Sequence, residues 1–231
     1  MKDNQRFVTS YWRVVLLVAR KDLRAEIRGR ELISSMFLFA FLAVVIFSFA
    51  LELDREAREN SVAGVLWVTI IFSGMLGLAR SMAVEKDKGS LDALLIAPVH
   101  RSALFYGKAL ANLLFTLVIA LLLMVLLTVL FNISLFVWQV LVVLVLGCIG
   151  FTVSGTLVSS MSVYARARET LLPIMLLPVI LPVLISAVRA SGALLAGLKA
   201  EDWLPWMQLL ALVDVVFLII TYFLFDYVVE E

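Results

Sequence analysis

The stretch ALFYGKALANLLFTLVIALLLMVLLTVLF, residues 103–131, decides the fold of this chain. It has no charged residue after Lys108, and it is longer than the roughly 20 helical residues that cross the hydrocarbon layer of a membrane. Transmembrane β-strands are shorter and alternate apolar with polar residues. The stretch therefore predicts a membrane-spanning helix.

The rest of the chain repeats this pattern. Of the 231 residues, 63% are hydrophobic and 16% are charged, whereas a soluble domain has roughly half apolar and about a quarter charged residues. Five further apolar runs occupy residues 32–53, 62–82, 135–161, 171–188 and 207–227. We therefore expect an all-α polytopic membrane protein with one domain, 1–231, whose six-helix membrane region covers 31–228.

Charge and cysteine content exclude several classes of function. The net charge of +1 is spread over short segments between the apolar runs, so nothing supports binding to nucleic acid. Cys148 is the single cysteine, which rules out an intramolecular disulfide, a cysteine zinc cluster and a CxxC redox motif.

The distribution of Lys and Arg predicts the orientation. Fifteen of them precede the first run or lie between the second and third or the fourth and fifth runs, and only Arg55, Arg58, Arg189 and Lys199 fall on the other side. Short loops rich in Lys and Arg stay in the cytoplasm. Both chain ends are therefore expected in the cytoplasm, with an even number of spans.

Residues 1–30 precede the first run, and the part from 11 to 30 has helical periodicity. Its apolar positions share one face: Trp12, Leu16, Ala19, Leu23 and Ile27. Its charged positions share the opposite face: Arg13, Lys21, Asp22, Arg24 and Arg28. This pattern predicts a cytoplasmic, interfacial helix whose apolar stripe faces lipid. A short soluble helix that packs on a partner is the alternative.

The polar interruption EKDKGSLDALLIAP, residues 85–98, predicts a short helix between the second and third spans. Gly89 and Ser90 suit an entry turn and an N-cap, Asp92 suits the first turn, and Pro98 helps to end the helix. The apolar positions on one face are Leu91, Leu94 and Leu95. Such a helix docks in a groove on a partner or rests on the membrane surface.

The same residues resemble a family motif. Glu85, Gly89, Ser90, Leu91, Asp92, Leu94, Leu95, Pro98 and Lys108 are similar to the pattern E-x-x-x-G-[ST]-L-[DE]-x-L-L-x-x-P, followed ten residues later by Lys, of ABC-2-type permeases. Within that group the chain resembles the CcmB family, the permease subunit of the heme exporter for cytochrome c maturation. LPIMLLPVILP, residues 172–182, resembles the proline-punctuated fifth span of that family. Asp92 stands where many members have Glu.

This resemblance implies a transporter subunit in the bacterial inner membrane. Residues 85–101 would couple the chain to a CcmA-like ATPase that binds ATP and Mg²⁺, with heme as a possible cargo and no cofactor held by this chain. Further implied partners are a second copy, CcmC-, CcmD- and CcmE-like proteins, and membrane lipids. The chain has no GxxxxGK[ST] phosphate loop, because Gly107 and Lys108 are followed by Ala109.

Other functions stay open at this point. A related ABC-2 permease could export a lipid, a polysaccharide or a drug, and a membrane scaffold would transport nothing. A membrane enzyme would need converging acid, base, nucleophilic or metal-binding groups, which the spans do not offer.

Two features inside the spans suggest further roles. Pro173, Pro178 and Pro182 remove backbone donors, so the fifth span should be kinked or locally unwound, as a hinge or simply for packing. Asp214 is an acid inside an apolar run, which favours a functional site by default. A structural role is our preferred interpretation, because no motif involves Asp214 and the unclear start of the sixth span also allows a position near the outer interface.

The remaining polar and aromatic residues favour simple roles. The only histidine, His100, lies outside the expected spans, so a heme pocket is not expected in this chain, and no metal site is predicted. Small residues let another helix approach the fourth span, within the chain or between copies: Gly147, Gly150, Ser154 and Gly155. Tryptophans near span ends suggest an interfacial belt: Trp12, Trp67, Trp138, Trp203 and Trp206.

Overall fold

The computed structural model describes residues 10–51, 55–87, 100–162 and 168–228. Seven helices form this part of the chain, and no strand occurs in it: α1 (Tyr11–Gly29), α2 (Glu31–Ala50), α3 (Arg55–Asp87), α5 (Arg101–Phe131), α6 (Trp138–Ser162), α7 (Arg168–Leu195) and α8 (Ala200–Val228). The all-α prediction is confirmed. Six of these helices, all except α1, are long and apolar enough to cross a membrane, as the sequence predicted.

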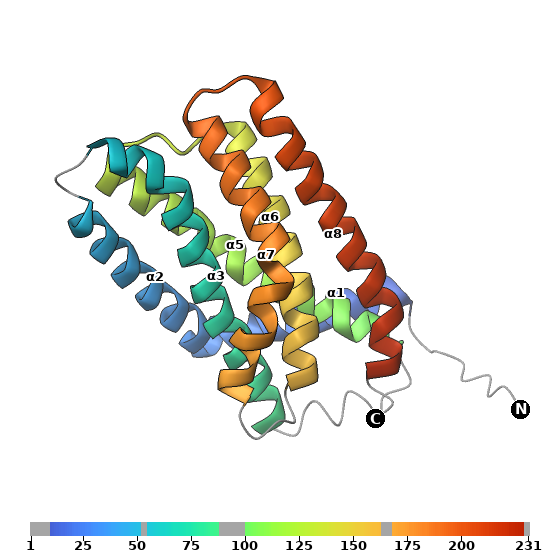
Figure 1. Cartoon of the computed structure of the whole chain (residues 1–231). Coiled ribbons are helices and arrows are strands. Elements are labelled where there is room, and N and C mark those ends of the chain that lie inside the picture. The colour runs from blue at the N-terminus through green and yellow to red at the C-terminus, as the bar shows by residue number, and fades with distance from the viewer. Residues whose placement is uncertain (1–9, 52–54, 88–99, 163–167, 229–231) are drawn as a thin grey trace, which may run out of the picture.

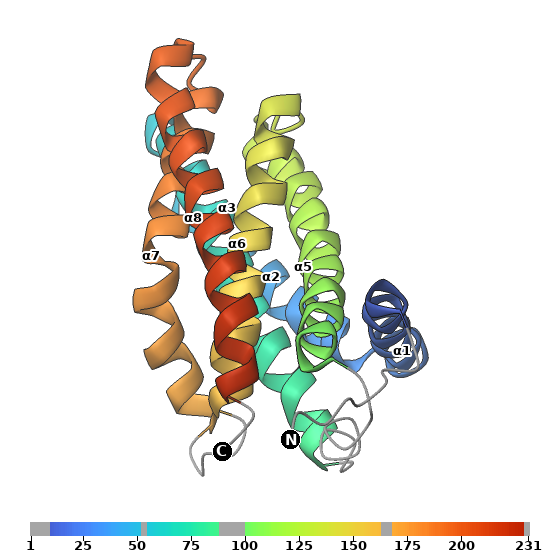
Figure 2. The same ribbon diagram turned by 90° about the vertical axis from the view of Figure 1, so that its right-hand side faces the viewer.

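The six spanning helices run up and down side by side, whereas α1 lies across the bundle near one end (Figures 1 and 2). We call this the α1 end. Helices α2, α5 and α7 begin there, and α3, α6 and α8 end there. At the opposite end, α2 ends and α3 begins, and the loops between α5 and α6 and between α7 and α8 lie there. This arrangement matches an even number of spans.

Two helix boundaries differ from the sequence prediction. Helix α8 begins at Ala200 rather than near residue 207, because Glu201 and Asp202 form its first turn. Acidic side chains there interact favourably with the helix dipole, although in the sequence they look like a loop. Helix α7 continues to Leu195 rather than ending near residue 188.

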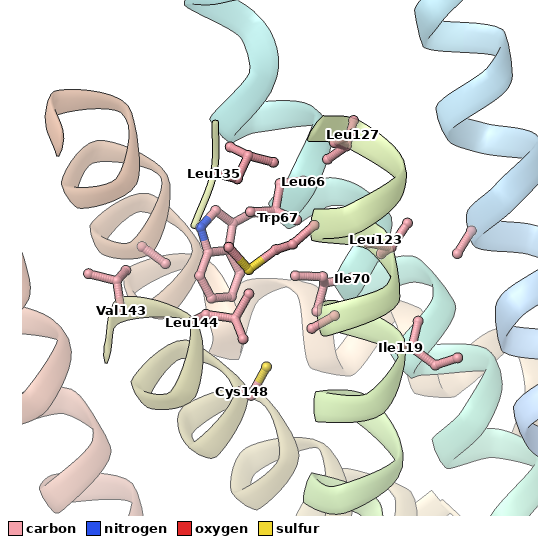
Figure 3. Close-up of a cluster of buried hydrophobic side chains, with 14 of the residues drawn as sticks. Leu66, Trp67, Ile70, Ile119, Leu123, Leu127, Leu135, Val143, Leu144 and Cys148 are labelled. Carbon is pink, nitrogen blue, oxygen red and sulfur yellow. The ribbon is translucent and has the colours of Figure 1, made fainter. Parts of the chain in front are cut away.

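Trp67 occupies the centre of the bundle, not its edge. Its side chain is 1% exposed and packs among Leu66, Ile70, Leu135 and Leu144 (Figure 3). The indole Nε1 donates a hydrogen bond to Ser191 Oγ at 3.0 Å, which links α3 to α7. The prediction that Trp67 belongs to an interfacial belt is therefore wrong. Trp12 and Trp138, which lie at helix ends, are 72% and 68% exposed.

Small residues on α6 let three helices approach it closely, as predicted. A Cβ atom at Gly147 would clash with the Trp67 ring of α3, and a Cβ atom at Gly155 would clash with Leu78, which is also on α3. A Cβ atom at Gly150 would meet Asp214 of α8 and Val183 of α7. These contacts lie within one chain, so intrachain packing accounts for all three glycines.

Hydrogen bonds between side chains and neighbouring helices hold α5 in the bundle. Asn112 Nδ2 donates to Thr156 Oγ1 of α6 at 3.0 Å, and the Tyr106 hydroxyl donates to the carbonyl of Leu218 in α8 at 2.9 Å. Such bonds are worth about 0.6–2 kcal/mol each inside a membrane protein. They fix which faces of the apolar helices meet.

The close contact between α6 and Trp67 predicts the effect of a single methyl group. We expect Gly147→Ala to lower the free energy of unfolding by about 1–3 kcal/mol, because the new methyl group overpacks against a buried ring. Gly64→Ala is the matched control, since a Cβ atom there has no neighbour within 4 Å. Thermal unfolding in detergent should show a drop for the first variant only. Equal behaviour of the two variants would contradict the packing described here.

Candidate functional site

In the sequence, the coupling motif falls between α3, which ends at the α1 end of the bundle, and α5, which begins there. Most of its residues fall outside the described part of the chain: Gly89, Ser90, Leu91, Asp92, Leu94, Leu95 and Pro98. Glu85 belongs to the last turns of α3, and Lys108 lies on α5. The structure therefore describes the two helices that flank the motif and what holds them.

Helix α1 packs directly on the beginning of α5. Val14, Val15 and Val18 are buried against α5, where Ala103 and Leu104 complete the cluster. The contact depends on Gly107, because a Cβ atom there would lie 2.7 Å from Val18 Cβ and 2.8 Å from the carbonyl oxygen of Val15. Gly107 thus allows the backbones of the two helices to come close together.

A largely buried ion pair adds to this contact. Lys108 Nζ on α5 lies 3.4 Å from Asp22 Oδ2 on α1, and the two side chains are 8% and 12% exposed. Lys21 Nζ, which is 44% exposed, lies 3.2 Å from the other carboxylate oxygen. Lys108 is the last residue of the motif, but the sequence offered no physical explanation for a lysine at this position. The structure supplies one, because Lys108 ties α1 to the helix that follows the motif.

Helix α2 connects α1 to α3. The chain turns between α1 and α2 at Arg30, in a left-handed conformation with φ of 54°. Glu26 of α1 accepts a hydrogen bond from the backbone N–H of Ile33 at 2.8 Å, which supports the start of α2. Arg80 of α3 forms an ion pair with Glu31.

Packing between α2 and α3 strengthens this connection. Met36 of α2 is 1% exposed and lies against Gly77, where a Cβ atom would crowd its sulfur atom. Both flanks of the motif are thus joined to neighbouring helices. We call the contacts of Asp22 with Lys108, Val18 with Gly107, Glu31 with Arg80 and Met36 with Gly77 the flanking frame.

The predicted amphipathic stripe of α1 is only partly correct. Trp12, Leu16 and Ile27 are 72%, 61% and 71% exposed, as expected of side chains that face lipid. Ala19 is instead buried in the main core, and Leu23 packs against the same core. The prediction was wrong for these two residues because α1 also packs on its own chain, which periodicity cannot reveal.

Asp214 lies deep within the bundle, not near the outer interface, a position that the sequence had left open. The earlier start of α8 puts it about 21 Å along the helix from Ala200, well within a ~30 Å hydrocarbon layer. It is 4% exposed, and neither carboxylate oxygen has a hydrogen-bond partner in the described part of the chain. Gly150 leaves room for it against α6.

The three prolines of the fifth span lie within a continuous helix. Helix α7 runs through Pro173, Pro178 and Pro182 without a break, so the expected local unwinding is not seen. Pro178 and Pro182 are exposed on the outside of the bundle. Ser186 Oγ donates to the carbonyl of Pro182 at 2.7 Å. The role of these prolines as a hinge remains a prediction.

The single histidine and the single cysteine of the chain belong to different parts of the structure. His100 precedes α5 outside the spanning segment, and its ring centroid is 6.0 Å from that of Tyr11. Cys148 is fully buried in the core near Trp67 (Figure 3). Within the described residues, no three His, Cys, Asp or Glu side chains gather in a way that could hold a metal ion.

The ion pair of the flanking frame can be tested by a double-mutant cycle. We expect Lys108→Met and Asp22→Asn each to destabilise the protein, with a coupling energy of about 1–3 kcal/mol between them, because the two groups interact directly. Lys21→Met is the control, since an exposed pair contributes about 1 kcal/mol or less. The measurement is thermal unfolding in detergent. Strictly additive effects of the two substitutions would argue against the pair.

The isolation of Asp214 predicts an unusual response to substitution. We expect Asp214→Asn to leave the free energy of unfolding unchanged or to raise it by about 1–3 kcal/mol, because no described partner is lost and an unpaired buried carboxyl is unfavourable. Asn112→Leu is the contrasting variant, because it removes a hydrogen bond to Thr156. Melting temperatures in detergent compare the two. A comparable drop in melting temperature for both variants would mean that the Asp214 side chain makes a stabilising contact.

Comparison with known proteins covers the flanking frame and all six spanning helices. The model of the family described as CcmB protein matches residues 13–230. Heme exporter protein B of Rhodobacter capsulatus is 29% identical over 194 residues, which cover 78% of this chain and 88% of that protein.

Two further relatives carry the same name. The protein of Pseudomonas aeruginosa is 26% identical over 193 residues, covering 83% of this chain and 86% of the relative. That of Bradyrhizobium diazoefficiens is 26% identical over 181 residues, covering 77% and 81%. Because the family model spans nearly the whole chain, the protein belongs to the CcmB family.

Proposed function

We propose that this chain is the transmembrane permease subunit of an ABC transporter for heme export and cytochrome c maturation. The observation that carries the proposal is the family match over residues 13–230, which includes six spanning helices and both flanks of the coupling motif. Three relatives that are each called heme exporter protein B, and that match over most of their length, support the same function.

ATP hydrolysis takes place in a partner in this proposal. The chain has no phosphate-binding loop, so ATP and Mg²⁺ bind to a CcmA-like subunit and the permease is not itself an enzyme. The docking element is the segment after Glu85. The residues that dock or shape it are Gly89, Ser90, Leu91, Asp92, Leu94, Leu95 and Pro98.

The flanking frame suggests how a movement of the ATPase is transmitted to the helices of the permease. A displacement of residues 88–99 acts on the end of α3 and the beginning of α5, which these residues join. Helix α1 follows α5 through Asp22 and Lys108, and α2 follows α3 through Met36 and Gly77. The bond between Asn112 and Thr156 extends the movement to α6. Packed elements of this kind move as units.

Orientation, cargo and assembly complete the proposal. The α1 end faces the cytoplasm of a bacterium, across the inner membrane, because most Lys and Arg residues flank that end. Heme is the substrate, and the complex contains a second copy of this chain and CcmC-, CcmD- and CcmE-like proteins. Pro173, Pro178 and Pro182 serve as the hinge of α7.

The coupling role is tested with substitutions in the docking segment. We expect Leu94→Asp and Leu95→Asp to abolish co-purification with the ATPase and to lower coupled ATP hydrolysis at least tenfold, because a charge replaces the apolar contact. Leu198→Asp is the matched control, since Leu198 is 51% exposed in the loop between α7 and α8, at the opposite end.

The readouts are complex formation and ATPase rate with the full permease in nanodiscs. Variants that insert normally, bind the ATPase and stimulate it as the original chain does would overturn the coupling role. Loss of function in the Leu198→Asp control would point to a general defect instead.

A further inference from the structure

The charges of α1 are sorted between its two sides. Its only acids, Asp22 and Glu26, are turned towards the protein, where they meet Lys108 and the start of α2. The charged side chains that α1 exposes are all basic: Arg13, Arg20, Lys21, Arg24 and Arg28. Arg13 and Arg20 form no ion pair with the part of the chain that the structure describes. The charges that α1 presents outwards are therefore all positive.

Beside this basic side lies an apolar groove of about 640 Å³, which is within the usual ~300–1,000 Å³ of ligand pockets. Four helices line it, and the lining residues are Tyr11, Trp12 and Val15 of α1, Tyr106, Ala109, Leu110 and Leu113 of α5, Ile149, Thr152 and Val153 of α6, and Leu218 and Tyr222 of α8. Leu16, which is 61% exposed, follows Trp12 by about one helical turn, and Arg20 follows Leu16 by another.

The polar groups in the lining of the groove are already hydrogen-bonded within the protein. The Tyr106 hydroxyl donates to the carbonyl of Leu218, and the Thr152 hydroxyl donates to that of Cys148 at 2.7 Å. Both hydroxyls therefore have partners before any ligand enters. A long hydrocarbon chain fits such a lining better than a polar molecule does.

We propose that α1 and this groove bind one anionic phospholipid, with an acyl chain in the groove and the phosphate at Arg13 and Arg20. The groove opens between spanning helices, where the surrounding solvent is lipid. The transverse helix α1 sets the level of the headgroups (Figure 2). Anionic headgroups complement a surface whose charges are all positive, at a level next to the acyl chains.

A second copy of the chain fits this face less well. In a twofold dimer the same surface of each copy meets the other, so the two basic sides of α1 would approach each other. Like charges that face each other at an interface are unfavourable. Charge complementarity thus favours the phospholipid as the occupant.

Trp12 provides a local probe of the site. It lies at the mouth of the groove, whereas Trp67 is in the core and Trp138, Trp203 and Trp206 lie near the opposite end. The experiment uses the full chain in phosphatidylcholine nanodiscs that contain a small fraction of phosphatidylglycerol with brominated acyl chains. The brominated lipid quenches tryptophan fluorescence. The quenching seen in the original chain but absent from the Trp12→Phe variant is the quenching of Trp12.

We expect brominated phosphatidylglycerol to quench Trp12 more strongly than brominated phosphatidylcholine at the same fraction. Arg13→Gln with Arg20→Gln should weaken this preference about thirtyfold, because two phosphate contacts are lost. The control is Arg24→Gln with Arg28→Gln, which removes the same number of positive charges from the same helix. It should change the preference for phosphatidylglycerol far less.

A second variant tests the groove itself. Leu113→Phe narrows the groove without touching the arginines, and it should reduce quenching by phosphatidylglycerol. Equal quenching by the two lipids, or equal effects of the two arginine pairs, would overturn the site, because only general attraction to a charged membrane would remain. Quenching that disappears as copies of the chain associate would show that a second copy occupies the groove.

Discussion

The hydrocarbon layer offers no water to polar groups, and the whole arrangement of this chain follows from that constraint. Backbone groups are satisfied within helices, which is why the described chain consists of helices and connections. Several polar side chains that enter the bundle find partners on other helices. Trp67 bonds to Ser191, Asn112 to Thr156, and Tyr106 to a carbonyl of α8. Helices of almost uniform apolarity thereby acquire specific neighbours.

Asp214 is one of several described side chains whose buried polar atoms have no hydrogen-bond partner, and it is the only carboxylic acid among them. It lies against Gly150, where the absence of a side chain leaves space for the carboxyl group, yet its oxygens have no partner there. A polar group of this kind is costly to keep inside a membrane. Its position between α6, α7 and α8 makes it a site to consider in the movement of these helices, separate from the coupling motif.

The α1 end combines mechanical connection with contact to lipid. The inner side of α1 binds α5 through Val18, Gly107 and the pair of Asp22 with Lys108. The outer side presents basic residues beside an apolar groove. The same helix would therefore follow movements of the coupling segment and remain at the level of the headgroups. In the proposed transporter, the lipid environment and the ATPase partner would meet at this end of the bundle.

Hydrophobic pattern determined the six spans and the transverse helix, and residue identities determined the motif between the second and third spans, because all of these depend on residues close together in sequence. Neither could determine which helices are neighbours. Trp67 looked like an edge residue and is central, Asp214 could have lain close to an interface and is deep, and Lys108 had no visible partner until α1 was placed beside it. Almost every face of these helices is apolar, so glycine contacts and single polar bonds choose among many similar packings. Those contacts join residues far apart in the chain, and only the tertiary structure reveals them.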